Sequence, residues 1–450
     1  MTSDLFDRID ARLGACERDV ARLASLEAIE NLQRAYGYYI DKGLWSEAAD
    51  LFAADSSWEW GQGGVYAGRE RIRAALALRG PEGLGPGELN NYITTQPIIT
   101  VAPDNESAQA RWRSNLQLHG ADVGHVWGEG TYENEYVRED GVWKIAVLHF
   151  YVTVLWDYDK GWVEGNIAMP SSSETLPPDR PPTEVYQALP GVYLPPYHYP
   201  NPVTGGGPRP EADAAPLRDG AASAELAALA REVEALSVRV VRLNDTRACE
   251  RLQRSYGYYV DKAMWQDVSD LFGPDSTLEI GGRGVFLGKK RVLEYMGIGL
   301  GPSGPQEGQV INHQQHQGIV TVDQDGLHAR GRWRAFVIGG SPWAAVNWGD
   351  VTYENHYLKV DGVWLIDKLR APFNMYTLYK DGWHKVTTPN TRPESFPPPP
   401  DLAPTVLYLT YPNYHNEPFH YPNPVTGKTA PPPHPAAGGV APMREEAPVA

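Results

Sequence analysis

The chain has 450 residues, which is more than one compact domain usually contains and suggests two or three. Its 40 Lys and Arg against 56 Asp and Glu give a net charge of −16, which is unsuited to a nucleic-acid backbone or an anionic membrane surface. No apolar run approaches the roughly 18–20 residues that cross a bilayer, and the first residues lack the features of a secretory signal. Two cysteines, Cys16 and Cys249, are too few for a disulfide framework or a structural zinc site. We therefore predict a cytoplasmic protein that binds neither nucleic acid nor membrane.

The chain repeats itself. The segment from Asn31, NLQRAYGYYIDKGLWSEAADLF, returns from Arg251 as RLQRSYGYYVDKAMWQDVSDLF, 220 residues later. WGEGTYENEYVREDGVWKI returns as WGDVTYENHYLKVDGVWLI at an offset of 221, and HYPNPVTG from His198 returns from His420 at 222. An offset that drifts by so little predicts a duplicated domain with one or two loop insertions.

Composition predicts the boundaries of the two domains. Residues 204–222 are small, polar and rich in Gly and Pro, which is typical of a flexible linker between a first domain, 1–203, and a second, 223–428. Residues 429–450 have almost no apolar side chains to bury, and we expect them to be disordered.

Each domain opens with apolar residues spaced 3, 4, 3, 4 and 3 apart, as in the a and d positions of a heptad repeat. The pattern predicts a helix that packs on its own domain. Pairing of the two helices, within one chain or between chains of a homo-oligomer, is the alternative. The residues are Phe6, Ile9, Leu13, Cys16, Val20 and Leu23, and Leu226, Leu229, Val233, Leu236, Val240 and Leu243.

A second, long helix is expected over about residues 26–52 and 246–272, with Tyr36 and Tyr256 on its apolar face. The following half of each unit is strand-like, and it contains a hairpin with an Asp-Gly turn in REDGVW and its counterpart. A helical element followed by a curved antiparallel sheet is an α+β architecture. The glycine runs GQGG and GGRGVFLG fall in hairpin turns, so we predict no nucleotide site.

Three features occur twice in the same order. They are the helix with its YxxxD and Trp, the turn of GxxxGR type before a second helix, and the DGVW hairpin. This pattern resembles the SnoaL-like branch of the nuclear transport factor 2-like superfamily, over about residues 20–165 and 240–385. The resemblance implies two tandem cones, each a bent sheet around a long helix with a pocket at its mouth. It also implies an intrachain pseudo-dimer through the outer sheet faces, because such cones commonly dimerise. The fold hosts many enzymes and binding proteins, so it does not decide the function.

Within that superfamily the pattern is similar to scytalone dehydratase, which carries an aspartate on the long helix and a histidine at the start of the next strand. Asp261 and His313 match in the second repeat, and Asp41 and Tyr92 occupy that register in the first. The second catalytic histidine of that family has no clear counterpart here. The HYPNPVTG and GTYENEYV segments resemble bacterial SnoaL-like lyases that release formaldehyde from lignin-derived diarylpropanes without a cofactor.

These four residues are the predicted catalytic set. The imidazole of His313 can accept a proton at neutral pH, and the Asp261 carboxylate would orient it and stabilise its charged form. The alternative is an aspartate that caps a loop and a structural histidine. Asp41 and Tyr92 would form a modified first site. His316 should face away from His313 on a regular strand, and a joint metal role has no supporting cluster, so neither metal nor cofactor is predicted.

The predicted substrate-binding set gathers phenols, amides and aromatic residues around the expected pocket. Tyr36 and Tyr256 could contact substrate or simply pack in the core, and Asn91 and Asn312 could donate to an oxyanion or cap a strand. The full set is Tyr36, Tyr256, Asn91, Asn312, His316, Trp60 and Trp348.

Two further features are expected on the domain surface. Arginines that alternate with Trp112 and Trp333 should form a sheet-surface ladder with solvated Glu133 and Glu354. The Pro- and Tyr-containing stretches 177–202 and 393–427 should form extended straps, whose HYPNPVTG ends cover a pocket mouth, in their own or the neighbouring cone.

The sequence thus predicts a cofactor-independent lyase, of dehydratase or retro-aldol (deformylating) type, that acts by acid–base catalysis on a small hydrophobic aromatic substrate. A non-catalytic binding or scaffold pseudo-dimer is the alternative. Convergence of Asp261 and His313 on one cavity favours the enzyme, whereas a purely apolar lining favours the binding module.

Overall fold

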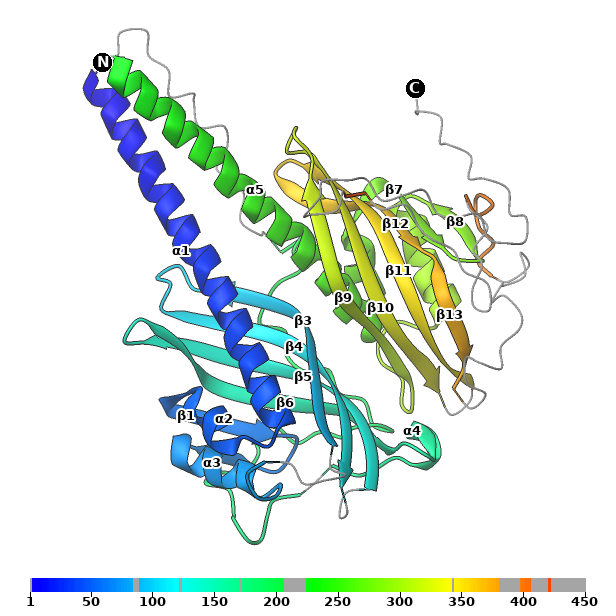
Figure 1. Ribbon diagram of the computed structural model, residues 1–450. Helices are drawn as coiled ribbons and strands as arrows, with labels where there is room; N and C mark the ends of the chain where they lie inside the picture. Colours follow the sequence, from blue (N-terminus) through cyan, green and yellow to red (C-terminus); the bar gives the residue numbers. More distant parts are fainter. Residues whose placement is uncertain are drawn as a thin grey trace. The chain divides into compact units, whose positions relative to one another are not determined.

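The computed structural model describes residues 2–83, 89–120, 124–169, 171–205, 224–341, 344–379, 397–405 and 420–421 (Figure 1). The chain divides into two compact units. Unit 1 consists of Met1–Pro200, Pro208–Arg247 and Pro305–Gly308, and unit 2 consists of Asn201–Gly207, Ala248–Gly304 and Gln309–Ala450. None of the described helices has a stretch long and apolar enough to span a bilayer.

Unit 1 contains one sheet of six strands in the order β2-β1-β6-β5-β4-β3. All neighbours are antiparallel except β1 and β6, which are parallel, so the expected antiparallel sheet contains one parallel pair. The strands are β1 (Phe52–Trp60), β2 (Val65–Ala67), β3 (Leu89–Val101), β4 (Ser107–Gly120), β5 (Gly124–Glu139) and β6 (Val142–Asp157).

The sheet of unit 2 repeats this topology as β8-β7-β12-β11-β10-β9, with an added strand, β13, beside β11. Each sheet is accompanied by helices, so the α+β class is confirmed. The strands are β7 (Phe272–Ile280), β8 (Gly284–Leu287), β9 (Val310–Val322), β10 (His328–Ser341), β11 (Ala344–Val360), β12 (Val363–Ala371) and β13 (Phe373–Leu378).

The predicted Asp-Gly hairpin joins β5 to β6 and β11 to β12. Asp140 and Gly141 have φ values of 51° and 79°, and Asp361 and Gly362 have 49° and 79°. Two consecutive residues with positive φ form the type I′ turn, whose twist matches that of the flanking strands. The local sequence therefore determines this hairpin in both units.

The heptad helix and the long helix of each repeat are one continuous helix, α1 (Thr2–Asp41) or α5 (Ala224–Asp261). The expected ends at about residues 52 and 272 are wrong, because each helix stops at the aspartate and a short helix follows. Gly43, with φ of 64°, turns the chain there. The other helices are α2 (Trp45–Asp50), α3 (Arg69–Ala77), α4 (Gly161–Glu164), α6 (Trp265–Asp270), α7 (Lys289–Glu294) and the π-helix η1 (Tyr295–Leu300).

The first half of α1 pairs with the start of α5 within unit 1. Their contact is an apolar cluster made by Leu5, Ile9, Leu226, Ala230 and Val233. Pairing within one chain, the alternative left open by the heptad pattern, is therefore what the structure contains.

The second half of α1 lies across the sheet of unit 1 (Figure 1) and is bonded to it by buried polar groups. The Gln33 side-chain oxygen accepts hydrogen bonds from Asn134 Nδ2 at 3.0 Å and from the Tyr136 hydroxyl at 2.8 Å. Trp112 Nε1 donates to the same hydroxyl at 3.0 Å. These residues define the inner face of the sheet, which faces the helix, and every second residue on each strand belongs to it.

The outer face of the unit 1 sheet is buried around Arg111 and Arg113, which corrects the expected solvated ladder. Arg111 and Arg113 are only 1% and 2% exposed, and they pair with Glu133 at 2.9 Å and Glu129 at 3.2 Å. In unit 2 the ladder is more open, because Arg334 is 55% exposed. The pairing of opposite charges was predicted correctly, but their burial in unit 1 was not.

A strap of the chain covers part of this outer face. Arg111 donates to the Pro195 carbonyl at 3.3 Å and stacks 3.8 Å from the Tyr197 ring centre, and His198 Nδ1 lies 2.9 Å from Glu133. The start of the HYPNPVTG segment thus binds the sheet on the side away from the helix, so its expected position over the mouth of its own cone is wrong. His420 makes the equivalent contact with Glu354 at 3.1 Å, and residues 422–427 lie outside the described part of the chain.

The turn at Gly43 offers a test of this architecture. A Cβ at Gly43 would lie 3.1 Å from the Gly83 carbonyl oxygen and would adopt a left-handed backbone conformation. Gly43→Ala should therefore lower the free energy of unfolding by about 1–2 kcal/mol. Gly14→Ala, within helix α1 and near only the end of the Arg18 side chain, should raise it by about 0.5–1 kcal/mol. Urea unfolding followed by circular dichroism measures both, and a neutral Gly43→Ala would contradict the assigned turn.

A buried histidine on the outer face should make stability depend on pH. His149 stacks on Tyr151 with ring centres 3.8 Å apart, and burial lowers its pKa to about 4. The unfolded chain, in which histidine titrates near pH 6.5, then binds the proton more readily, so stability should fall as the pH falls from 6.5 towards 4. Burial raises the pKa of neighbouring Glu59. Protonation of Glu59 therefore stabilises the folded state, and it opposes the effect of His149 as the pH falls towards the ordinary pKa of a glutamate.

The free energy of unfolding is therefore compared at pH 6.5 and at pH 5, a range that lies above the ordinary pKa of a glutamate. We expect protonation of His149 to lower the stability of the wild-type protein by about 1.5 kcal/mol over this range, and His149→Phe to lose much less. His119→Phe, at an exposed position, is the control and should keep the wild-type slope. An unchanged slope in His149→Phe would show that another group carries the pH dependence.

Candidate functional sites on the inner faces of the sheets

The inner face of unit 1 carries a cluster of aromatic side chains around Tyr36 of α1. Trp58 Nε1 of β1 donates to the Tyr36 hydroxyl at 3.1 Å, and the Tyr36 ring meets the Tyr132 ring edge-on at 6.5 Å. Burial raises the pKa of Tyr36 to about 12 and that of Tyr132 well above its ordinary value. These phenols are therefore protonated at neutral pH and can donate hydrogen bonds or protons, but they cannot act as bases.

Arg79, just beyond α3, extends its guanidinium into this cluster. Its Nη1 donates to the Tyr92 hydroxyl at 2.8 Å, and its central carbon lies 5.5–5.7 Å from the ring centres of Trp58, Trp60 and Tyr92. Burial, the largest influence, would lower the pKa of Arg79, but the neighbouring tyrosines outweigh it and raise that pKa. The result is a fixed positive charge inside an aromatic site.

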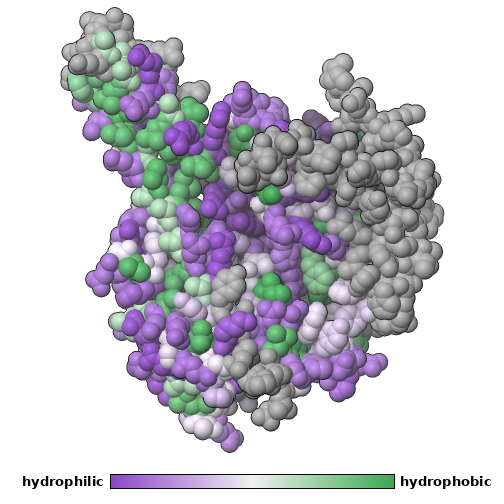
Figure 2. Space-filling model, in the orientation of Figure 1, coloured by the Kyte–Doolittle hydropathy of each residue, from purple (hydrophilic) through white to green (hydrophobic). Residues whose placement is uncertain are grey.

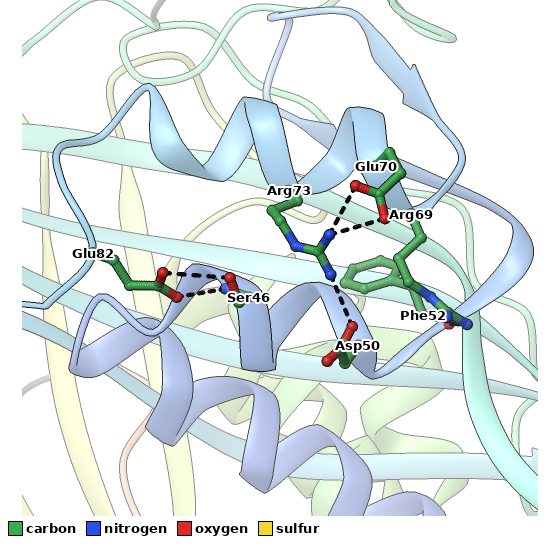
Figure 3. Close-up of polar contacts among 7 residues, drawn as sticks. All are labelled: Ser46, Asp50, Phe52, Arg69, Glu70, Arg73 and Glu82. Atoms are coloured by element: carbon green, nitrogen blue, oxygen red, sulfur yellow. Dashed lines mark hydrogen bonds and ion pairs between the residues drawn. The ribbon is translucent and has the colours of Figure 1, made fainter.

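Polar contacts on both sides hold the segment that carries Arg79 (Figure 3). Arg73 of α3 bridges Glu70 and Asp50 at 2.8–2.9 Å. After Arg79, the Glu82 carboxylate accepts from the Ser46 backbone N–H at 2.9 Å. In addition, Trp45 Nε1 donates to the Gly80 carbonyl at 3.0 Å. Helix α2 and the loop after α3 are thereby bonded to each other.

The structure brings Asp261 and His313 together on the inner face of unit 2. Asp261 ends α5, its side chain is 2% exposed, and its Oδ1 accepts the His313 backbone N–H at 2.6 Å. The same oxygen lies 3.6 Å from His313 Nδ1, and the imidazole is 18% exposed. A buried carboxylate thus stands beside an imidazole that solvent or a ligand can reach.

Phenols and an arginine accompany this pair. The Tyr256 and Tyr353 rings meet edge-on at 6.3 Å, and burial raises the pKa of Tyr256 well above its ordinary value and that of Tyr353 to about 12. Arg283, from the turn between β7 and β8, donates to the Tyr295 hydroxyl at 2.5 Å and lies 5.9 Å from the Phe373 ring centre. Unit 2 therefore also combines protonated phenols with an arginine.

Several residues of the predicted substrate-binding set point away from these sites. Asn91 neighbours inward-facing Tyr92 on β3, so it lies on the outer face, where its amide donates to Gln117 at 2.9 Å. By the same alternation from His313, Asn312 and His316 lie on the outer face of unit 2. Trp348 is also there, in edge-on contact with Phe336 at 5.7 Å.

The other described residues of the predicted set lie on the inner faces. Tyr36 and Tyr256 are buried on the inner faces, Trp60 stacks on Phe150 at 5.6 Å, and Tyr92 occupies the place of His313. Asp41 is the last residue of α1, and its side chain lies outside the described part of the structure.

Sequence reasoning missed Arg79, Arg283, Tyr132 and Tyr353. The tyrosines belong to the repeated TYEN segment and could have been found from their inward register. The arginines could not, because the repeat aligns Arg79 with Gly299 and Arg283 with Gly63. Among the described residues, no three His, Cys, Asp or Glu side chains gather closely enough to hold a metal ion.

The sequence profile of the SnoaL-like domain matches residues 21–149 and 241–370, more than half of the chain. A solved structure described as a putative scytalone dehydratase, from Novosphingobium aromaticivorans DSM 12444, is similar at 18% identity over 34% of this chain and 96% of that chain, with a TM-score of 0.27. Hexachlorocyclohexane dehydrochlorinase LinA-type3, from Novosphingobium barchaimii LL02, is similar at 17% identity over 31% and 93%, with a TM-score of 0.28. On the strength of the two profile matches, the chain belongs to the SnoaL-like domain family and carries one copy of the domain in each half.

Proposed function

We propose that the protein is a cofactor-independent lyase that acts on a small hydrophobic aromatic substrate at the inner face of unit 2. The observation that carries the proposal is the buried Asp261 carboxylate beside the accessible imidazole of His313. Lyase chemistry of this kind needs a base near neutral pH and a proton donor for the leaving group, and an enclosed aromatic wall suits the substrate.

In this mechanism His313 takes a proton and Asp261 stabilises the resulting imidazolium. The hydrogen bond from the His313 backbone N–H keeps the carboxylate in position without using the imidazole. In a dehydration the proton comes from carbon, the neighbouring C–O bond breaks, a C=C bond forms, and the hydroxide leaves as water after protonation. In a retro-aldol cleavage the proton comes from a hydroxyl group, whose oxygen forms the C=O bond of the leaving aldehyde as the C–C bond breaks. The imidazolium then returns the proton to the carbanion that the broken bond leaves on the other fragment.

Tyr256 and Tyr353 are the proposed hydrogen-bond donors. Burial keeps both phenols protonated, so they can stabilise negative charge that develops on a substrate oxygen. Their rings also form part of the apolar wall that excludes water from the reacting atoms.

Unit 1 is proposed to bind ligand without carrying the main activity. Tyr92 stands in the register of His313, and its hydroxyl already accepts a hydrogen bond from Arg79. A phenol is a poor base at neutral pH, whereas an imidazole is well matched to that task. A binding role for this copy therefore agrees better with its side chains than a second, equal catalytic site.

A comparison of three variants tests the proposal. His313→Ala should reduce kcat/KM by about 10²–10⁴-fold in an assay with a panel of β-hydroxylated aromatic compounds, because it removes the general base. His316→Ala, on the opposite face of the same strand, is the matched control and should keep nearly full activity. Tyr92→Phe should change the rate only modestly.

Two outcomes would contradict this assignment. One is an unchanged rate in His313→Ala, which would remove the base from the mechanism. The other is an equal loss in His313→Ala and Tyr92→Phe, which would show that both units contribute to the chemistry. Circular dichroism of each variant checks that its fold is retained.

A further inference from the structure

We propose that both inner-face sites select aromatic ligands that carry a carboxylate, with Arg79 in unit 1 and Arg283 in unit 2 as the binding groups. The inference deepens the proposed function, since it rests on the inner faces being ligand sites and names the class of ligand. It does not depend on which reaction takes place there.

Arg79 has unused hydrogen-bonding capacity. A guanidinium group has five N–H donors, and the structure assigns one of them, to the Tyr92 hydroxyl. Among the described residues, no carboxylate forms an ion pair with Arg79. Neighbouring groups bury the guanidinium, with three aromatic ring centres within 6 Å of its carbon, while the residue as a whole keeps solvent-exposed surface. Its free donors can therefore reach a ligand placed against those rings.

Arg73, six residues before Arg79, differs from it in being paired with carboxylates of the protein. Its guanidinium is bonded to the carboxylates of Asp50 and Glu70, so it serves to hold α3 against α2 (Figure 3). An arginine whose charge is neutralised by protein carboxylates has little left to offer an anion, whereas Arg79 keeps its full charge among neutral phenols.

Unit 2 has the same feature from a different sequence position. Arg283 donates to Tyr295, packs against Phe373, and is likewise without a carboxylate partner among the described residues. The repeat aligns Arg283 with Gly63 and Arg79 with Gly299. The two arginines therefore have no common origin in the duplication, and each repeat has placed a guanidinium among its inner-face aromatic residues separately.

Together these features match an aromatic carboxylate. The rings supply stacking and apolar contact, the arginine supplies paired N–H donors in the geometry of a carboxylate, and the protonated phenols add further hydrogen bonds. A neutral aromatic alcohol would leave the guanidinium without a counter-charge, and acetate would leave the rings without a partner.

Calorimetric titration of the full chain with benzoate tests the proposal. The wild-type protein should bind two benzoate molecules, and it should bind benzyl alcohol and acetate at least tenfold more weakly. Arg79→Gln and Arg283→Gln should each weaken one site by about 10–100-fold, so that each variant retains one site. Arg73→Gln is the control and should retain both.

Equal affinity for benzoate and benzyl alcohol, or an unchanged stoichiometry in both Arg79→Gln and Arg283→Gln, would overturn the inference. His313→Ala should still bind two benzoate molecules. Benzoate binding without turnover of any test substrate would therefore defeat the proposed reaction alone, and turnover without charge-dependent binding would defeat this inference alone.

The paired helices α1 and α5 leave half of their heptad pattern exposed. On each helix one row of apolar residues, spaced by seven, is buried: Ile9 and Cys16 at 5% exposure on α1, and Leu226, Val233 and Val240 at 4–6% on α5. The second row of each heptad pattern is exposed: Phe6, Leu13 and Val20 at 37–56%, and Leu229, Leu236 and Leu243 at 36–54%. Figure 2 shows hydrophobic residues gathered along these helices.

A two-stranded coiled coil buries both rows of each helix, so this pair uses only half of its heptad pattern. The exposed half combines the row that begins at Phe6 on α1 with the row that begins at Leu229 on α5, and these are opposite positions (a and d) of the heptad. The buried seam likewise combines one a row and one d row. We propose that a second copy of the chain covers it and continues the α1–α5 interface into a four-helix bundle.

Light scattering after size exclusion measures the outcome. The wild-type protein should have twice the chain mass of 49.8 kDa, and Leu13→Glu combined with Leu236→Glu should have the chain mass itself. Val185→Glu, at an 83% exposed position outside the helices, should remain dimeric. A monomeric wild type, or a dimer that survives the double substitution, would overturn this assignment.

Discussion

The buried hydrogen bonds between the long helix and the sheet are the constraint on which the rest of each domain depends. In unit 1, Asn134 donates to Gln33 of the helix and accepts the His149 backbone N–H at 3.3 Å, so one side chain joins the helix to two strands. In unit 2, Asn355 makes the equivalent bonds to Gln253 at 2.7 Å and to the Arg370 backbone at 3.4 Å. A buried polar group without its partner costs about 1–3 kcal/mol, so these bonds favour a single helix position.

That helix position divides the sheet into two faces with different tasks. The inner face holds aromatic residues, phenols and one arginine in each unit, and it is where we place ligand binding and catalysis. The outer face of unit 1 holds paired charges such as Arg111 and Glu133, together with a strap of the chain. Because neighbouring residues on a strand point to opposite faces, two adjacent residues such as Asn91 and Tyr92 can serve these separate tasks.

Duplication preserved this scaffold while the inner faces diverged. The hydrogen-bonded Gln, Asn, Tyr and Trp residues are the same in both units, whereas Tyr92 is replaced by His313 and the arginines come from unmatched positions. The scaffold residues are constrained by buried bonds with fixed partners. Under the proposed function the inner-face positions are constrained by a ligand instead, and so can change without unfolding the domain.

The sequence by itself determined the duplication, the α+β class and the Asp-Gly hairpins. Each of these depends on local pattern or on internal repetition, which a single chain displays directly. Only the tertiary structure decided that Asn91 and Trp348 face away from the sites, that the outer arginines of unit 1 are buried, and that Arg79 and Arg283 reach the inner faces. Those facts depend on strand register and on contacts between segments that are far apart in the sequence, and no local spacing encodes them.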